Sequence, residues 1–360
     1  MIQVFCTAPT ISSSGKYYLF PLLEPFLQPA AIATDVAKTV NPQWKKHYTI
    51  TADAATANVF ILPMDIAWYL HTGQRQVVEE FIATAKQWQK PCWIFSGGDY
   101  GISWPDQYVQ ILRLSGTRSG NKGNQFVMPP FMPDPLCLAA ERDIKLLDLP
   151  SKPTVGFCGQ ANGSQLARLK DYVRAAVKWI KQLQGNYLYD LQPFTSTTYQ
   201  RYQVLQTLQQ EQLVNANFLL FDQYKGGASS EEQQVQSRLR YYQNISNNAY
   251  TLCIRGAGNF SVRFYDCLAS GRIPVLIDTD SMLPLENLID WNAHILKVPA
   301  HKMTEAARLL IAFHQPFSLD QWQQLQLTNR HLWQEKLTYD GFFAHFHLLP
   351  PNQSFAHLYS

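Results

Sequence analysis

Charged side chains are scarce in this sequence. Aspartate, glutamate, lysine and arginine make up 16% of the 360 residues, whereas about 25% is ordinary for a globular protein. The formal net charge is only +3, and lysine and arginine form no concentrated stripe of the kind that binds nucleic acid. The composition therefore argues against a nucleic-acid partner. It is compatible with an anionic small ligand or with contact at an acidic membrane surface.

Long apolar runs and paired cysteines are also missing. No window approaches the roughly 18 apolar residues of a membrane span. Residues 1–9, MIQVFCTAP, lack the basic and apolar regions of a signal peptide. The six cysteines form no CxxC pair and no zinc-ligand spacing, which favours buried free thiols in a reducing compartment. We therefore expect a cytoplasmic protein with at most peripheral contact with the inner face of the membrane.

The glycine fingerprint of a dinucleotide site is absent as well. The first expected strand, IQVF (2–5), is not followed by GxGxxG, the pattern in which glycines bring a pyrophosphate close to a helix terminus. This absence argues against a dinucleotide-dependent enzyme built on two Rossmann-like halves, such as a sugar-nucleotide epimerase.

What the sequence does contain is a repeated alternation of buried strands and helices. NVFILP (58–63), an amphipathic stretch (74–89) and CWIFS (92–96) predict a strand–helix–strand unit. The pattern restarts after proline-bearing residues 148–153, with apolar strands expected at TVGFCG (154–159), FLLFD (218–222), YTLCI (250–254) and IPVLID (273–278). The expected fold class is α/β, with two Rossmann-like domains that face a central cleft. The first domain is expected over 1–150, the second over 151–325, and a helical tail over 326–360.

A long amphipathic helix is expected directly after residues 154–159. Ser164 is well placed to cap it. Its apolar residues recur at 3-4-4-3 spacing, which puts them on one face: Leu166, Leu169, Val173, Val177 and Ile180.

The segment 250–280 carries the clearest chemical signal. A buried strand ends at Arg255 and Gly256, and Ser261 can cap a helix whose first turn carries Arg263 and Asp266. Helix amino termini bind phosphate groups, and two arginines suit a diphosphate. Asp266 can accept hydrogen bonds from ribose hydroxyls, as acidic residues do in dinucleotide sites. The pattern predicts a nucleoside-diphosphate site, although Arg263 and Asp266 could also form a plain surface ion pair.

A second acidic pattern lies just downstream. Asp278-Thr279-Asp280 is a DxD sequence after an apolar strand, and carboxylates so placed can bind Mg²⁺ or Mn²⁺. A metal-dependent glycosyltransferase therefore stays an alternative interpretation.

The segment 250–291 resembles the exostosin family of glycosyltransferases. In that family a strand ending in Arg-Gly leads to Ser-x-Arg, a hydrophobic pair, an acidic residue, a helix of small residues and a Pro-Val strand. The matching residues here are Arg255-Gly256, Ser261-Val262-Arg263, Phe264-Tyr265, Asp266, GRIPV (271–275), Leu283-Pro284-Leu285 and Ile289-Asp290-Trp291. VGFCG (155–159), which ends in Gly159, resembles the strand that opens the family's second domain. Asp266 stands where glutamate is common, and Ile254 replaces a frequent proline.

The resemblance implies a GT-B architecture, with acceptor binding in the first domain and donor binding in the second. It implies an inverting transfer from a UDP-sugar or similar nucleotide-sugar to a glycan or lipid-linked acceptor, as in polysaccharide or glycoconjugate synthesis. The implied donor site is formed by Arg255, Gly256, Ser261, Arg263, Asp266 and Gly159, without a metal ion or another cofactor.

The catalytic base is expected in the first domain, because an acceptor hydroxyl is a poor nucleophile without one. Asp99 in the loop GGDYG (97–101) and Asp65 after the strand 58–63 rank first, and His71 is a third candidate. Each also has a plain structural interpretation, as a turn residue, a helix cap and a surface side chain. A non-catalytic carbohydrate- or nucleotide-binding module would keep the arginines and lack such a group in the cleft.

Overall fold

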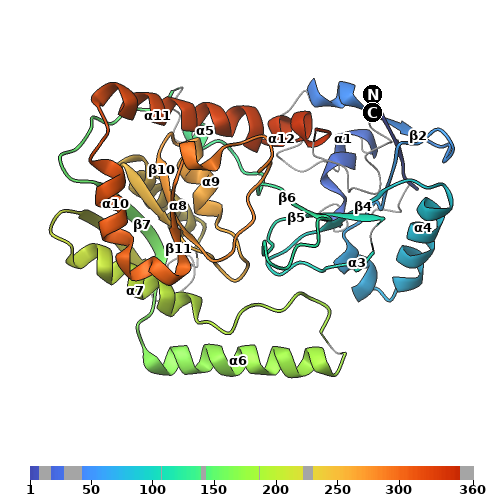
Figure 1. Ribbon diagram of the computed structural model, residues 1–360, viewed down its shortest axis with the longest axis horizontal. Helices are drawn as coiled ribbons and strands as arrows, with labels where there is room; N and C mark the ends of the chain where they lie inside the picture. The colour runs from blue at the N-terminus through green and yellow to red at the C-terminus, as the bar shows by residue number, and fades with distance from the viewer. Residues whose placement is uncertain are drawn as a thin grey trace.

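The computed structural model describes residues 1–7, 18–27, 43–106, 108–138, 143–185, 187–221 and 230–348. Two parallel sheets lie side by side in it, each flanked by helices (Figure 1). This arrangement confirms the α/β fold class with two Rossmann-like domains in the GT-B manner. We refer to the two sheets and their flanking elements as the first and the second domain.

The first domain is built on six strands in the order β2-β1-β3-β4-β5-β6, all of them parallel. The runs expected at 2–5, 58–63 and 92–96 all form strands. A short, continuous apolar run is typical of a strand in a parallel sheet, because helices cover both faces of such a sheet. The strands are β1 (Ile2–Phe5), β2 (Tyr48–Thr51), β3 (Val59–Ile61), β4 (Cys92–Ser96), β5 (Val109–Arg113) and β6 (Gln125–Val127), and the helices are α1 (Glu24–Leu27), α3 (Ile66–His71), α4 (Arg75–Gln87) and α5 (Pro135–Leu138).

The second domain contains five parallel strands in the order β11-β10-β9-β7-β8. Its central strands β7 and β9 end at the segments singled out in the sequence. The strands are β7 (Thr154–Gln160), β8 (Asn215–Phe221), β9 (Tyr250–Cys253), β10 (Ile273–Asp278) and β11 (Leu296–Pro299), and the helices are α6 (Gln165–Leu183), α7 (Thr197–Gln210), α8 (Glu231–Ser246), α9 (Val262–Ala269) and α10 (Ala306–His314).

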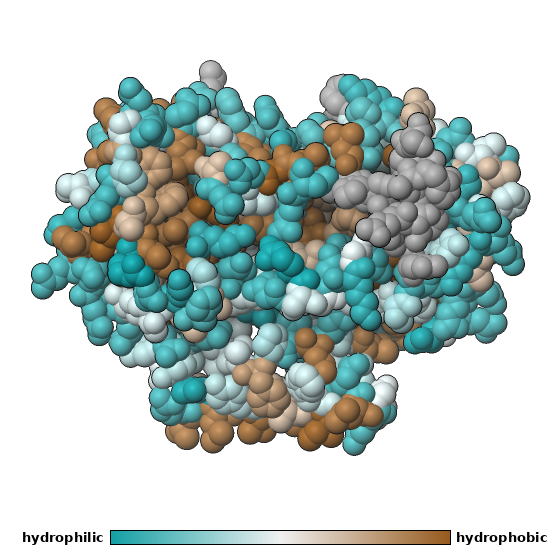
Figure 2. Space-filling view, viewed as in Figure 1, coloured by the Kyte–Doolittle hydropathy of each residue, from teal (hydrophilic) through white to brown (hydrophobic). Residues whose placement is uncertain are grey.

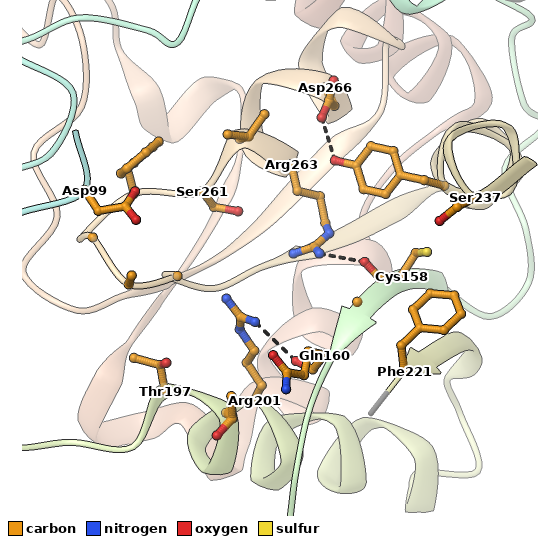
Figure 3. A pocket seen from close by; sticks show the side chains of 18 of the residues that line it. Asp99, Cys158, Gln160, Thr197, Arg201, Phe221, Ser237, Ser261, Arg263 and Asp266 are labelled. Atoms are coloured by element: carbon orange, nitrogen blue, oxygen red, sulfur yellow. Dashed lines mark hydrogen bonds between the residues drawn. The ribbon is translucent and has the colours of Figure 1, made fainter. Parts of the chain in front are cut away.

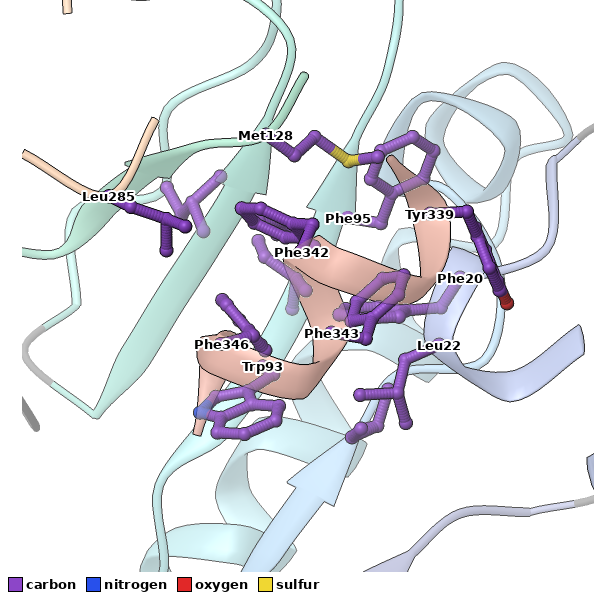
Figure 4. Packing of buried hydrophobic residues seen from close by; sticks show 14 of the residues in the cluster. Phe20, Leu22, Trp93, Phe95, Met128, Leu285, Tyr339, Phe342, Phe343 and Phe346 are labelled. Atoms are coloured by element: carbon purple, nitrogen blue, oxygen red, sulfur yellow. The ribbon is translucent and has the colours of Figure 1, made fainter. Parts of the chain in front are cut away.

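The last helices return to the first domain. α11 (Leu319–Leu332) continues through a π-helical turn (Trp333–Leu337) into α12 (Tyr339–Phe346). Phe342 and Phe343 of α12 are fully buried in the core of the first domain, and the ring of Phe346 packs edge-on against Trp93 of β4 (Figure 4). A segment expected as a helical tail thus completes the core of a sheet that ends about 200 residues earlier in the chain.

Helix α6 forms where it is expected but does not bury its apolar face. Ser164 caps it, its hydroxyl accepting a hydrogen bond from the backbone N–H of Ala167. No residue of the helix is buried. In Figure 1 the helix runs along the lower edge of the molecule, apart from both sheets.

Two contacts join α6 and the segment after it to the first domain. The Lys178 ammonium group donates a hydrogen bond to the Tyr100 hydroxyl, with 3.0 Å between the atoms. Asp190, in the segment between α6 and α7, forms an ion pair with Arg113 of β5 at 2.8 Å. The α6–α7 segment therefore bridges the two domains below the sheets.

Candidate functional site

A cavity of about 720 Å³ opens at the carboxyl ends of β7 and β9. Its walls come from the end of β7, the first turns of α7 and α9, one face of α8, and the loop 256–260. The first domain contributes Asp99. Parallel sheets bind ligands at this edge, where strand ends and helix amino termini meet. Gly256, Ser261, Arg263 and Asp266, which come from the segment singled out in the sequence, lie on its lining.

Arg263 lies in the first turn of α9 and points into the cavity (Figure 3). Its Nη2 donates to the carbonyl oxygen of Cys158 at 2.7 Å, and its guanidinium lies over the ring of Phe157, 4.3 Å from the ring centre. The buried Nε has no hydrogen-bond partner in the part of the chain that the structure describes. One edge of the guanidinium is thus fixed against β7, while a donor stays available for a ligand.

Arg201 reaches the same cavity from α7, opposite Arg263 (Figure 3). Its Nη1 and Nη2 donate to the carbonyl oxygens of Gln160 and Arg255, at 3.2 and 2.8 Å. Its buried Nε has no hydrogen-bond partner among the described residues. Burial and, to a smaller extent, the positive charges of Arg263 and Arg255 lower the pKa of Arg201 to about 10. Gathering like charges in this way is costly unless an anion neutralises them.

Sequence reasoning missed Arg201. One sequence signal indicates where α7 begins: the pair Ser196-Thr197 precedes a largely polar helical stretch, and Ser196 is the residue that caps the helix. An arginine in the second turn after such a cap can reach the helix amino terminus.

Arg255 points away from the main cavity. It is only 3% exposed, and its Nη2 donates to the side-chain oxygen of Gln192 and to the carbonyl oxygen of Ala257. The side chain lines a much smaller pocket, which shares Phe260 and Ser261 with the cavity. Within the described ranges its Nε and Nη1 have no hydrogen-bond partner, and burial lowers its pKa to about 10. Its positive charge still contributes to the potential in the cavity.

Asp266 lies deeper in the cavity, one turn into α9. It is 1% exposed, and its Oδ2 accepts a hydrogen bond from the Tyr241 hydroxyl of α8 (Figure 3). Its Oδ1 is buried and accepts no hydrogen bond from the residues that the structure describes. Burial raises the pKa of Asp266 to about 7, against the opposing effects of Tyr241, Tyr242 and Arg263. The free oxygen can accept a hydrogen bond from a ligand hydroxyl.

Ser261 and Gly159 complete the lining around Arg263. Ser261 occupies the N-cap position of α9, yet its side chain makes no capping hydrogen bond. A Cβ atom on Gly159 would lie 2.9 Å from Nη2 of Arg263. Glycine at this position therefore leaves room for the guanidinium.

Of the three candidate bases, only Asp99 lies on the described lining of the cavity. Asp65 is buried at the N-cap of α3, where its two carboxylate oxygens accept hydrogen bonds from the backbone N–H groups of Ala67 and Gly97. Burial raises the pKa of Asp65 to about 6. His71 is exposed, and its Nε2 lies 2.7 Å from the Tyr189 hydroxyl. The hydrogen bond from the Gly97 N–H to Asp65 anchors the loop 97–101, which carries Asp99.

The DxD sequence lies at a contact between the domains. Asp280 accepts hydrogen bonds from the backbone N–H and the hydroxyl of Ser119, and Asp278 accepts one from the backbone N–H of Ser281. Arg118 lies 3.9 Å from Asp278 and forms a closer ion pair with Glu286. Within the described ranges no group of three His, Cys, Asp or Glu side chains is placed to hold a metal ion. These contacts assign the two carboxylates a structural use at the interface.

The charges around the cavity favour an anion. Arg201, Arg238 and Arg263 line it together with Asp99 and Asp266, and the raised pKa of Asp266 keeps part of its population neutral near pH 7. The positive charge, the unpaired donors and the helix amino terminus suit a phosphate group. The open position on the Asp266 carboxylate suits a hydroxyl group of the same ligand.

The second domain also matches a known protein family. Residues 193–313 match the family model of the exostosin GT47 domain, which confirms the resemblance found in the sequence. The Exostosin-1 homolog of Caenorhabditis elegans is 28% identical over 89 residues, which are 25% of this chain and 23% of that protein. The alignment thus spans about a quarter of the length of this relative.

Solved structures resemble the chain more distantly. A variant of TarM from S. aureus, in complex with fondaparinux, alpha-GlcNAc-glycerol and UDP, is 7% identical, with 84% of this chain and 55% of that chain covered and a TM-score of 0.36. The pneumococcal O-GlcNAc transferase GtfA, in complex with UDP and GlcNAc, is 10% identical, with coverages of 81% and 56% and a TM-score of 0.31. Because these likenesses are weak, the residues of the cavity are interpreted from their own geometry and contacts.

Proposed function

We propose that this protein is a glycosyltransferase that moves a sugar from a nucleotide-sugar, with a UDP-sugar as the favoured donor, to a hydroxyl of a glycan or lipid-linked acceptor. The observation that carries the proposal is the pair of guanidinium groups of Arg201 and Arg263. They face each other in the cavity with unpaired donors, and both belong to the segment that matches the exostosin GT47 domain.

The donor would bind with its diphosphate between Arg201, Arg263 and the amino terminus of α9. Charged hydrogen bonds of this kind stabilise a diphosphate both as part of the bound donor and as the leaving group. The free oxygen of Asp266 would accept a hydrogen bond from a ribose hydroxyl. Tyr241 keeps that carboxylate in place through its own hydrogen bond.

The transfer itself would be a single displacement with inversion. The acceptor hydroxyl oxygen attacks the anomeric carbon and forms the new glycosidic bond. The bond from that carbon to the diphosphate oxygen breaks, and its electron pair leaves with the nucleoside diphosphate. The Asp99 carboxylate takes the hydroxyl proton. Asp99 is favoured for this step because it lines the cavity from the first domain, opposite the arginines.

The proposal includes independence from divalent metal ions, because guanidinium groups and a helix terminus supply the positive charge at the leaving group. It also includes a cytoplasmic location, which the free state of all six cysteines supports.

A combined binding and transfer assay tests the proposal. Thermal unfolding is followed with UDP, GDP, ADP and their nucleotide-sugars, and transfer to oligosaccharide and lipid-linked acceptors is measured with and without EDTA. We expect a rise in the unfolding temperature with UDP or its sugars and turnover that EDTA leaves intact. UDP binding without transfer to any acceptor would instead indicate a binding module. Turnover that EDTA abolishes and Mn²⁺ restores would favour a metal site.

A further inference from the structure

Helix α6 presents a continuous apolar face to the outside of the molecule. The five residues expected on one face lie there, and their exposed fractions range from 45% for Val177 to 73% for Leu166. Leu183 extends the face at the end of the helix and is 85% exposed. All six side chains are thus exposed, and apolar residues gather along the lower edge of Figure 2. A face of this kind is unusual on a soluble surface and marks an interaction site.

Positive charge accompanies the apolar face. Five basic residues lie on the 19-residue helix, namely Arg168, Lys170, Arg174, Lys178 and Lys181, against a single acidic one, Asp171. Lys170 and Lys181 are exposed, and helical geometry places them next to the apolar residues on one flank. A basic amphipathic helix has the two features that bind an anionic lipid surface.

The only carboxylate of the helix is turned inward. Asp171 accepts hydrogen bonds from the hydroxyls of Ser196 and Thr198, at 2.6 and 3.4 Å. The rings of Tyr172 and Trp179 contact the ring of Phe194, in the segment that follows α6, although Trp179 is still 44% exposed. The inner face of α6 is therefore anchored by polar and aromatic contacts, and its outer face carries leucine, valine and isoleucine beside lysine.

We propose that α6 docks the protein on an anionic membrane surface, with its apolar face in the interface between headgroups and acyl chains. The helix is too rich in charge to cross a bilayer: no helix in the described part of the chain is long and apolar enough to do so. A second copy of the chain is a poorer occupant, because it would bring the same excess of positive charge to the contact. The proposal does not depend on the proposed enzymatic activity.

The docked orientation also follows from the fold. α6 lies along one edge of the molecule. Its contact with Tyr100 and, through the next segment, that with Arg113 fix it to the first domain, and its hydrogen bonds with Ser196 and Thr198 fix it to the second. A lipid surface bound there would lie below both sheets at once.

Vesicle flotation of the full chain tests the docking. Vesicles of phosphatidylcholine alone are compared with vesicles in which part of it is replaced by phosphatidylglycerol. We expect binding to the anionic vesicles that falls as salt is added. Lys170→Glu with Lys181→Glu should lower the partition coefficient at least about tenfold, because each basic residue near an anionic surface contributes to binding. Leu169→Gln with Ile180→Gln should lower it by about as much, because the apolar face supplies the insertion.

Two matched variants are the controls. Lys122→Glu with Lys302→Glu changes two exposed lysines elsewhere, and Leu213→Gln with Leu319→Gln changes two leucines of similar exposure. Both should bind anionic vesicles like the unchanged protein. Absence of vesicle binding, or equal binding by all variants, would overturn the proposal. A dimer in sedimentation experiments that Leu169→Gln with Ile180→Gln abolishes would assign the face to a second copy and would overturn it as well.

Discussion

Gly258 of the second domain lies directly against the backbone of Asp99 in the first. A Cβ atom on Gly258 would come within 2.0 Å of the Asp99 carbonyl oxygen, which already accepts a hydrogen bond from the Ser115 hydroxyl at 2.6 Å. The loop that carries the favoured base and the loop at the donor cavity therefore meet backbone to backbone. The position of Asp99 relative to the arginines depends on the absence of a side chain at residue 258.

The substitution Gly258→Ala tests whether this contact between the two loops is needed. The new methyl group would force the two loops apart, so we expect a loss of stability of roughly 1–3 kcal/mol and a marked fall in the transfer rate. Gly256→Ala is the matched control for stability alone, because its Cβ would find its nearest neighbour, Nη2 of Arg201, at an ordinary 3.7 Å. Urea denaturation and donor turnover are measured for both. Equal stability of the two variants would contradict the interdomain contact.

Arg201→Ala and Arg263→Ala should each weaken the binding of UDP. Each removes a charged donor from the cavity, so the loss is about 2–3 kcal/mol, which corresponds to about 30- to 150-fold in the dissociation constant. Isothermal titration calorimetry measures it. Arg308→Ala serves as the control, because Arg308 pairs only with Glu305 on the surface. Unchanged affinity in a folded Arg201 variant would remove this residue from the site.

Asp99→Asn and Asp65→Asn should fail in different ways. Loss of the base in Asp99→Asn should abolish transfer while UDP affinity survives. In Asp65→Asn the single amide oxygen can replace only one of the two acceptors for Ala67 and Gly97, so stability should fall by about 1–2 kcal/mol. Turnover, UDP titration and denaturation separate the two effects. An Asp65→Asn variant of normal stability that has lost all turnover would identify Asp65 as the base instead.

The buried aspartates predict a pH dependence of stability. Burial raises the pKa of Asp266 from 3.8 to about 7 and that of Asp65 from 3.8 to about 6. Between the unfolded and folded values the folded protein binds more protons than the unfolded chain, so its stability falls as the pH rises through this window. Urea denaturation from about pH 4 to about pH 7.5 should show this fall, and Asp266→Asn should flatten its upper part. A slope near pH 7 that the variant keeps would show that another group is responsible.

Much of the fold could be predicted because it depends on patterns of residues that are close together in the sequence. Buried strands such as 92–96 and 250–254 are short apolar runs next to turn residues, and Ser164 marks the start of α6. Arg263 and Asp266 could be assigned to the cavity because they lie within one turn of a helix that follows a strand. Local sequence therefore predicted strands of both sheets and two of the residues that line the cavity.

The remaining features depend on contacts between distant residues. Arg201 joins the cavity because α7 packs against β8, which brings its guanidinium to the carbonyl oxygens of Gln160 and Arg255. The Ser196 cap marks where the helix begins but not where this side chain goes. The apolar spacing of α6 predicts a face but not what covers it, and a buried and an exposed face have the same period. The inward turn of Arg255 depends on Gln192, which lies 63 residues earlier.

The placement of α12 has a consequence for the order in which the protein folds during synthesis. A ribosome releases the six strands of the first sheet long before it makes Phe342 and Phe343, and domains generally fold as they emerge. Even if the first sheet forms as it emerges, the rings that pack on Trp44 and Trp93 are not available until nearly the whole chain has been translated. A chaperone that shields these two side chains would act on the nascent chain throughout the synthesis of the second domain.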